Sequence, residues 1–566
     1  MKYTTLVIAC WILLACKSTS PTDKSADVVF VNAKIWTADS DTSFREALAV
    51  KGNQILEVGS RSQIENLIGK STQVIDLKGK LVTPGFNDAH IHFLSGSLVL
   101  ASLNLLSCTS LAEMKHLIAS YAKQHPDKQW LTGTGWQYDF FPTGLPDKSI
   151  LDSLVPDRPM YLRSYDGHSG LANSKALEAA KINRHTVYTG FGEIVRDQKG
   201  EPTGVLKEGA QSLFAAVIPK PSREEKLEAL RLGLKFADSL GITSLQNASG
   251  TAEEYALYQA LLANQELTLR VSMAFSTGVK TSEEEIQQFI KLKKEESSKE
   301  WLKAQAIKFM LDGVIESHTA VMLNPYSDLS PNDPAQKNTF ALPLNDYQRL
   351  VNRLDEEGFQ LYTHAIGDAA VREVLNAYEK ALEVNGKKGQ RHRIEHIEQL
   401  SPTDLPRFAH LGVLPSMQPI HADPGTVEVW SKAVGKERLP NSFPWQSLLS
   451  SGASLTFGSD WPACINADPI RGIHNAVNRR TIDGAPPEGW IPEQRVSLAS
   501  ALKAYTYSGA YASFDEQQKG KLAKGYLADL IVLSRDLFTI PSMEIYQAKV
   551  ILKMVNGKLV YKSLSD

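Results

Sequence analysis

Short apolar runs alternate with longer helical patterns along most of this chain. Helical stretches such as Arg223–Ser239, Glu283–Lys294 and Asp346–Glu357 separate runs that we predict to be strands. The expected strands are residues 81–92, 242–246, 269–274, 306–310, 359–364, 393–396, 413–417 and 454–460. This alternation predicts an α/β fold with a parallel sheet, and eight strands predict a closed (β/α)₈ barrel of the TIM type. An open doubly wound sheet is the alternative, but the sequence has no glycine-rich dinucleotide fingerprint to support it.

The two ends of the chain contain short strands and tight turns instead. Residues 28–83 hold apolar runs separated by glycine-containing turns, and residues 515–566 include Asn556-Gly557, a strong hairpin signal. Each end alone is too small for a two-layer sandwich, so we expect both ends to build one small β-sandwich. The barrel then occupies residues 84–514. Residues 93–240 are too many for one strand–helix unit, and we expect an inserted subdomain there, over the barrel mouth.

The N-terminus resembles a bacterial lipoprotein signal. Lys2 precedes an apolar run that ends in Leu13-Leu14-Ala15-Cys16, which is similar to a lipobox, and a plain signal peptide is the alternative. We therefore expect residues 1–16 to be a signal peptide with a lipidated cysteine, and residues 17–27 to be a tether. A lipid would anchor the protein to a membrane surface of the bacterial cell envelope, facing the periplasm or the exterior. Whether Cys108 and Cys464 pair stays open.

Charge and composition restrict the partners of the chain. Lys and Arg number 61 against 63 Asp and Glu, so no basic excess points to a nucleic acid. The hydrophobic fraction of 43% is ordinary for a globular protein, and no apolar run is long enough for a mature membrane-spanning helix. We expect a small-molecule substrate as the main partner, and a homodimer stays open.

Two histidines, His90 and His92, stand two positions apart at the end of the first barrel strand. Side chains alternate along a strand, so both imidazoles point to one place, and imidazole is a common transition-metal ligand. Two ligands do not close a metal site, and ordinary histidines at a strand end are the alternative. Three further strands end at His364, His396 and Asp460. Because barrels carry their sites at the carboxyl ends of strands, we expect these side chains to share a metal site.

Lys308 lies on the fourth expected strand and is the least ordinary candidate. A lysine buried on a strand is costly unless it is neutralised or paired. It could pair with Asp312 or Asp460, or CO₂ could convert it to a carbamate that bridges two cations. The other candidates also have simpler interpretations, since the histidines could be hydrogen-bonded core residues and Asp460 could cap the next turn.

The motifs PGFNDAHIH, IKFMLDGVIESHTA, THAIGDAAV, HRIEHIE and FGSDWP together resemble the amidohydrolase superfamily. The similarity covers the mature chain and is strongest to the amidohydrolase-3 branch, which includes N-substituted formamide deformylase-like proteins. The resemblance implies one or two divalent cations, and zinc is the metal we expect first. It implies that His90, His92 and Asp460 hold one cation, that His364 and His396 hold the second, and that carboxylated Lys308 bridges them.

The resemblance also implies a reaction, the hydrolysis of a non-peptide carbon–nitrogen bond in an amide, formamide or N-acyl group. A metal-activated hydroxide attacks the carbonyl, and Asp460 carries the proton from water to the leaving nitrogen. His168 on the insertion would bind the substrate or stabilise the oxyanion. His318 stands where family members often have arginine. Deamination of a heterocycle at the same site is one alternative, and a non-catalytic ligand-binding lipoprotein is another.

Several aromatic residues lie in the insertion and beside the last strand of the barrel. They are Trp136, Tyr138, Phe140, Phe141 and Trp461. Such residues suggest an apolar or aromatic group on the substrate, although aromatic side chains more often simply pack in a core.

Overall fold

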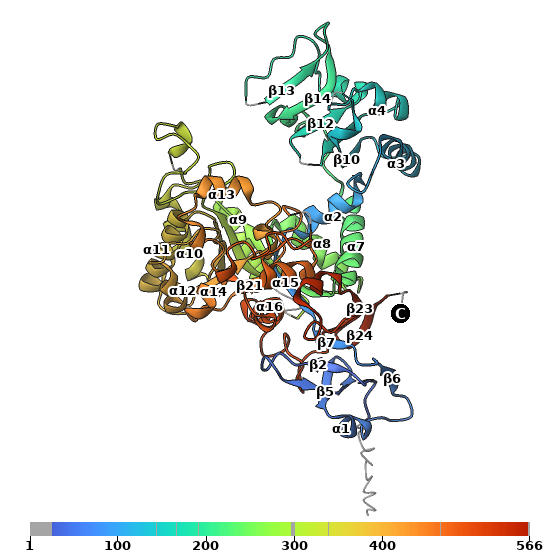
Figure 1. Cartoon of the computed structure of the whole chain (residues 1–566), viewed down its shortest axis with the longest axis vertical. Coiled ribbons are helices and arrows are strands. Elements are labelled where there is room, and N and C mark those ends of the chain that lie inside the picture. The colour runs from blue at the N-terminus through green and yellow to red at the C-terminus, as the bar shows by residue number, and fades with distance from the viewer. Residues whose placement is uncertain are drawn as a thin grey trace, which may run out of the picture.

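The computed structural model describes residues 25–142, 144–165, 167–190, 192–295, 300–337, 339–464 and 466–563. The signal sequence expected at residues 1–16, and most of the tether, lie outside these ranges. Within them the molecule has three parts: a central barrel, a β-sandwich beside it, and an inserted subdomain (Figure 1). None of the helices in the described ranges is both long and apolar enough to cross a membrane.

The barrel is one parallel sheet in the strand order β21-β20-β19-β18-β17-β16-β15-β8. Its strands are β8 (Phe86–Ile91), β15 (Ile242–Gly250), β16 (Arg270–Ser276), β17 (Leu302–Met310), β18 (Gln360–Ala365), β19 (Arg393–His396), β20 (Leu414–Met417) and β21 (Thr456–Phe457). The two end strands meet through the residues that follow them. Asp460 donates its N–H to the His90 carbonyl at 2.7 Å, and His92 donates to the Trp461 carbonyl at 2.9 Å. The predicted (β/α)₈ barrel is confirmed.

Strands β15 and β17 are each four residues longer than expected, and the first and last expected strands differ more. Residues 81–92 form two strands, because β7 (Leu81–Pro84) belongs to the sandwich and β8 begins after Gly85. The last barrel strand was expected to run to Asp460, but β21 ends at Phe457. Asp460 instead lies in a turn with a φ of 56°, the left-handed region that side chains usually avoid.

Helices cover the outside of the barrel (Figure 1). They are α7 (Arg223–Ser239), α8 (Ala252–Ala263), α9 (Glu283–Lys294), α10 (Leu344–Glu356), α11 (Asp368–Asn385), α12 (Leu405–Leu411), α13 (Glu428–Val434), α14 (Trp445–Ser450), α15 (Pro469–Asn478), α16 (Leu498–Ala504) and α17 (Tyr507–Ala512). Reciprocal capping boxes fix the start of α7, through Ser222 and Glu225, and the start of α9, through Ser282 and Glu285. One large apolar cluster fills the space between strands and helices.

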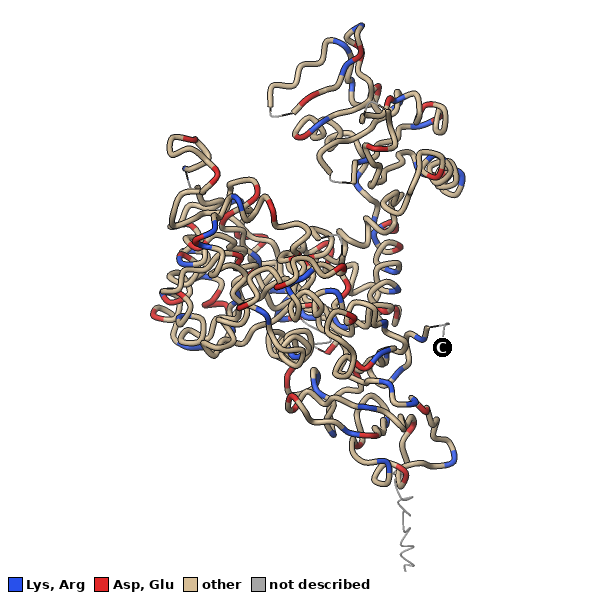
Figure 2. The backbone as a smooth tube through the Cα atoms, in the orientation of Figure 1, with Lys and Arg blue, Asp and Glu red and all other residues tan. Residues whose placement is uncertain are grey.

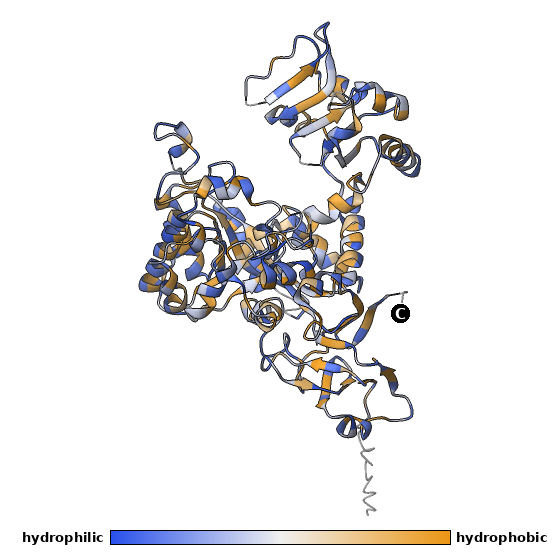
Figure 3. Ribbon diagram, in the orientation of Figure 1, coloured by the Kyte–Doolittle hydropathy of each residue, from blue (hydrophilic) through white to orange (hydrophobic). Residues whose placement is uncertain are grey.

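Both chain ends contribute to the β-sandwich. Its four-stranded sheet holds β1 (Val28–Val31), β4 (Ala47–Lys51), β5 (Gln54–Gly59) and β6 (Gln73–Asp76). The six-stranded sheet holds β2 (Lys34–Trp36), β3 (Phe44–Arg45), β7, β22 (Leu530–Leu533), β23 (Val550–Val555) and β24 (Lys558–Lys562). Strand β7 pairs antiparallel with β22 from the other chain end. Buried apolar residues of both sheets, among them Phe30 and Val532, share one core, and Figure 3 shows these strands as largely hydrophobic.

The inserted subdomain follows β8 and α2 (Phe93–Ala101). Its six-stranded sheet contains β9 (Leu103–Asn104), β10 (Leu131–Trp136), β11 (Met160–Ser164), β12 (Ser169–Ala172), β13 (Gly192–Arg196) and β14 (Pro202–Glu208). Helices α3 (Leu111–Gln124), α4 (Ser149–Leu154) and α5 (Ser174–Ala179) pack beside it, over apolar clusters separate from the barrel core. Figure 1 shows the insertion standing away from the barrel, next to α2 and α7. The expected cover over the barrel mouth is therefore not seen in this structure.

Charged residues of both signs are interspersed over all three parts of the molecule (Figure 2).

Candidate metal centre

The carboxyl end of β8 brings His90 and His92 to Asp460. The Nε2 atoms of His90 and His92 lie 3.3 and 3.1 Å from Oδ1 of Asp460. His90 is fully buried, and His92, which directly precedes α2, keeps 28% of its side chain exposed. Ligand atoms of these three residues all lie within 4.8 Å of one another. A group this compact can bind a single cation.

His364 and His396 extend this group across the barrel. Their rings lie 4.5 Å apart between centroids, and the His396 ring is 4.9 Å from that of His90. His364 donates its Nε2–H to the carbonyl of Gly313 at 3.0 Å, and His396 donates its Nδ1–H to Gln418 at 2.8 Å. Each ring thus has one nitrogen engaged, and the other nitrogen keeps a lone pair for a metal.

Lys308 lies on β17 and is buried among these groups. Burial lowers the pKa of its amine, and the charges of Glu395 and Asp460 oppose that shift only in part. A buried amine of lowered pKa is more nucleophilic at neutral pH, because the neutral form carries the free electron pair. The same burial lowers the pKa of His364 to about 3, helped by the Lys308 charge, and so keeps that imidazole neutral and able to bind a metal.

Buried polar atoms without hydrogen-bond partners provide a test of fit for a cation. Within the described chain these atoms include Nε2 of His90 and Oδ1 of Asp460. Buried polar groups are rarely left unsatisfied, so orphaned atoms at one place indicate a missing ligand. Imidazole nitrogens and carboxylate oxygens suit zinc and similar divalent metals. The residues present fit the metal that the sequence implies.

A buried ion pair holds His90 in its orientation. His90 donates its Nδ1–H to Oε2 of Glu395 at 2.5 Å, and Arg393 donates to both oxygens of the same carboxylate at 2.8 and 2.9 Å. All three side chains are completely buried. Burial alone would raise the pKa of Glu395, but Arg393 and then His90 outweigh it and leave that pKa far below its usual range. A permanent carboxylate therefore fixes the tautomer of His90 and directs its Nε2 to the metal position.

Asp312 fastens the loop that follows β17. Its carboxylate accepts backbone N–H groups of Val321, Ile366 and Gly367 at 2.9 to 3.0 Å. Burial raises the pKa of Asp312 to about 7, although these hydrogen bonds oppose the shift. The residue joins the β17 and β18 loops and is a structural support beside His364.

The sequence did not point to His421, because this residue does not end a strand. It lies four residues beyond β20, in the 3₁₀ turn Pro419–Ala422. Its Nε2 is 3.3 Å from Oδ2 of Asp460, and its Nδ1–H donates to Glu398 at 3.0 Å. His396, His421 and Asp460 form a second compact group of candidate ligands. A histidine in the loop after an expected strand was the only signal in the sequence.

His168 lies apart from this cluster, on the inserted subdomain, with 66% of its side chain exposed. Its Nδ1 lies 3.1 Å from both carboxylate oxygens of Glu208. The substrate role expected for it stays a prediction. Trp136 and Phe141 are buried in the core of the insertion, so they pack there.

His318 pairs with Asp328 at 3.0 Å. Cys108 and Cys464 are free cysteines, which answers the pairing question for these two residues.

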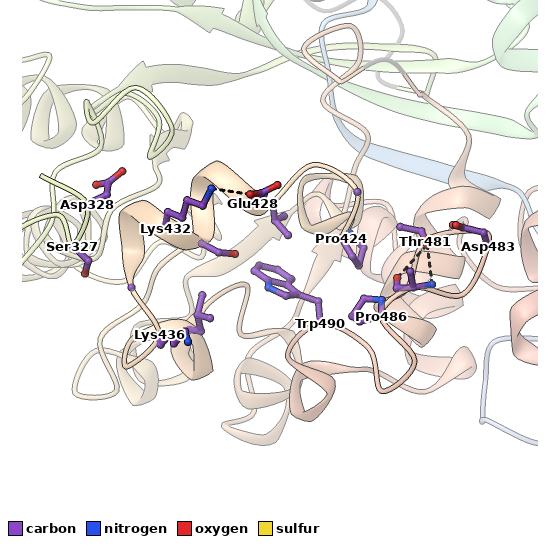
Figure 4. Close-up of a pocket in the computed structure, with 16 residues that line it drawn as sticks. Ser327, Asp328, Pro424, Glu428, Lys432, Lys436, Thr481, Asp483, Pro486 and Trp490 are labelled. Carbon is purple, nitrogen blue, oxygen red and sulfur yellow. Dashed lines mark hydrogen bonds and ion pairs between the residues drawn. The ribbon is translucent and has the colours of Figure 1, made fainter.

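A cavity of about 920 Å³ lies on the flank of α13, with Trp490 pointing into it between α13 and residues 481–486 (Figure 4). None of the candidate ligands lines this cavity. This cavity is therefore separate from the candidate metal centre.

The fold and this centre define a metal-dependent hydrolase, and the chain belongs to the Amidohydrolase family (Amidohydro_3), whose profile matches residues 73–561. Protein LONG AFTER FAR-RED 3 of Arabidopsis thaliana is 33% identical over 96% of this chain and 93% of its own length. N-substituted formamide deformylase of Arthrobacter pascens is 27% identical over 95% of this chain and 98% of its own length. The crystal structure of an uncharacterized metal-dependent hydrolase from Pyrococcus furiosus superposes with a TM-score of 0.72 at 25% identity, covering 90% of this chain and 99% of the other.

Proposed function

We propose that the protein hydrolyses a non-peptide carbon–nitrogen bond in an amide, formamide or N-acyl compound. The observation that carries the proposal is the convergence of four imidazoles, one lysine and one aspartate on a buried point at the carboxyl end of the barrel. The similarity to a formamide deformylase over nearly the whole chain supports this bond class. Pure binding of a metal or a ligand would not need an aspartate that can also carry a proton.

We assign the ligands from the same geometry. His90, His92 and Asp460 would hold one cation, and His364 and His396 would hold a second. Lys308 would bridge the two after reaction of its amine with CO₂, which forms an N–C bond and releases one proton. Zinc fits the nitrogen-rich donor set best.

The residues of the chain would divide the work of hydrolysis. A bound divalent cation supplies a Lewis acid that brings the pKa of water close to neutrality. Asp460 accepts the proton from that water at its carboxylate and delivers it to the departing nitrogen, which becomes an amine. Burial opposes the ionised form of Asp460, but His90 and its other imidazole neighbours hold the pKa far below the usual value. Asp460 is therefore ionised at neutral pH.

The test is metal analysis and a hydrolysis screen of purified protein that lacks residues 1–16. We expect bound zinc and turnover of N-substituted formamides or N-acyl amines. The variant Asp460→Asn should abolish turnover and keep the fold, whereas the matched surface change Asp41→Asn, at a side chain 63% exposed, should alter neither. Ammonia release from heterocyclic amines, with no amide cleavage, would replace this proposal by a deaminase. Bound metal without any turnover would favour a binding protein.

We also propose that the mature protein is anchored at the bacterial cell envelope through a lipid on Cys16. The support is the lipobox-like sequence Leu13-Leu14-Ala15-Cys16. Full-length protein should fractionate with membranes and label with a fatty-acid probe, and the variant Cys16→Ser should lose the label. An unlabelled wild-type protein would reject the anchor.

A further inference from the structure

The two oxygens of Asp460 face different partners. Oδ1 lies against His90 and His92, at 3.3 and 3.1 Å, and is the oxygen that points to the first cation position. Oδ2 lies 3.3 Å from Nε2 of His421. A carboxylate can rotate about its last side-chain bond and exchange its two oxygens. Something must hold it if one oxygen is always to face the metal.

His421 is itself held on its far side. Its Nδ1–H donates to Oε1 of Glu398 at 3.0 Å, and the indole N–H of Trp430 donates to Oε2 of the same carboxylate at 2.7 Å. Exposure of the three side chains is low, with 14% for His421, 6% for Glu398 and 1% for the whole of Trp430. The Glu398 backbone is tied as well, because its carbonyl accepts the N–H of Phe443 at 2.8 Å. The imidazole therefore has little freedom to turn.

We infer that His421 is a positioning residue, which keeps Oδ2 of Asp460 turned away from the cation and so leaves Oδ1 as the ligand. Glu398 and Trp430 fix the direction of His421 and act through it. Outer contacts of this kind decide the orientation of a ligand without touching the metal. This role deepens the proposed function and rests on it, since it requires Asp460 to bind a cation.

A direct ligand role for His421 is the competing possibility, because His396, His421 and Asp460 also form a compact group. The two roles differ in the number of ions bound. A lost ligand removes one cation from the protein, whereas a lost positioning contact leaves the number unchanged and weakens the binding.

The experiment titrates metal-free protein with Co²⁺ and compares wild type with His421→Ala, His421→Gln and Glu398→Gln. We expect the dissociation constant of His421→Ala to rise by about 10 to 100-fold at unchanged stoichiometry. Gln can place an amide N–H close to the position of Nε2, so His421→Gln should recover part of the loss. Glu398→Gln should shift the constant in the same direction by a smaller factor. The matched control His410→Ala changes an exposed histidine of α12 and should bind like wild type.

Once a substrate is known, kcat should fall in His421→Ala while KM stays close to wild type, since the substrate does not contact the imidazole in this role. Unchanged Co²⁺ affinity in His421→Ala, or the loss of one equivalent of Co²⁺, would overturn the positioning role and leave the proposed function standing. Wild-type protein that takes up no metal would overturn both.

Discussion

The ion pair between Arg393 and Glu395 offers the sharpest test of how the barrel supports its centre. Both residues lie on β19, two positions apart, so their side chains share one face of the strand. Both are completely buried, and the guanidinium also lies 3.8 Å above the ring of Tyr362. The change Glu395→Gln keeps the size of the side chain and removes only its charge.

The expected loss of stability follows from this burial. Removing one partner of a buried pair leaves the other charge unpaired in a medium of low polarity, which costs about 3 to 5 kcal/mol. Arg393 keeps hydrogen bonds to the Ala89 carbonyl at 2.6 Å and to Ser416 at 2.8 Å, but both acceptors are neutral. We therefore expect the free energy of unfolding to fall by about 3 to 5 kcal/mol at pH 7.

The assay is urea unfolding of metal-free protein, so that lost metal binding does not contribute. The matched control is Glu65→Gln, which breaks the Arg61–Glu65 pair, where both side chains are at least half exposed, and it should not change the unfolding curve. The pKa of Glu395 is lowered in the folded state, so its contribution is complete above pH 4.5 and is lost as the pH falls below that value. A loss below about 1 kcal/mol at pH 7, or a loss that grows in acid, would refute the reasoning.

Two further predictions concern other supports of the barrel. Burial raises the pKa of Glu254 on α8 from 4.5 to about 7, so folding favours its protonated form. The variant Glu254→Gln should therefore be more stable than wild type above pH 7, by at most about 3 kcal/mol. Thermal unfolding scans should show that this gain vanishes below pH 4.5. A side chain at Gly458 would meet the backbone nitrogen of His90 at 2.4 Å. Gly458→Ala should therefore separate β8 from the turn that carries Asp460 and lower the affinity for Co²⁺. The control Gly278→Ala should bind Co²⁺ like wild type, because its added methyl group meets only Leu342, at 3.6 Å.

Local signals in the sequence predicted the regular elements well. Helices α7 and α9 begin and end at the expected residues, and capping boxes, which act within one turn of the chain, account for where they begin. The strand alternation predicted the barrel for a similar reason, since the number and order of the strands leave few topologies. The length of β21 was overestimated because the left-handed turn at Asp460 depends on its contact with β8, which has no local sign.

Contacts between distant segments account for what the sequence did not reveal. His421 and Glu398 lie on different loops and meet only after β19 and β20 pair, so neither stood out as a candidate. The position of His168 depends on how the whole insertion is oriented on α2 and α7. Orientation of a subdomain follows from few contacts and leaves no periodic pattern in a sequence.

The antiparallel pairing of β7 with β22 has a consequence for the synthesis of the molecule. Strand β7 can pair on one edge with β2, which is made before it, but its partner on the other edge, β22, is made only after the whole barrel. Until then its edge is open, and open edges favour association with other chains. A polypeptide that stops before β22 would carry this unpaired strand edge beside an otherwise complete barrel. This edge would therefore be a place at which chaperones and proteases recognise an unfinished copy of the protein.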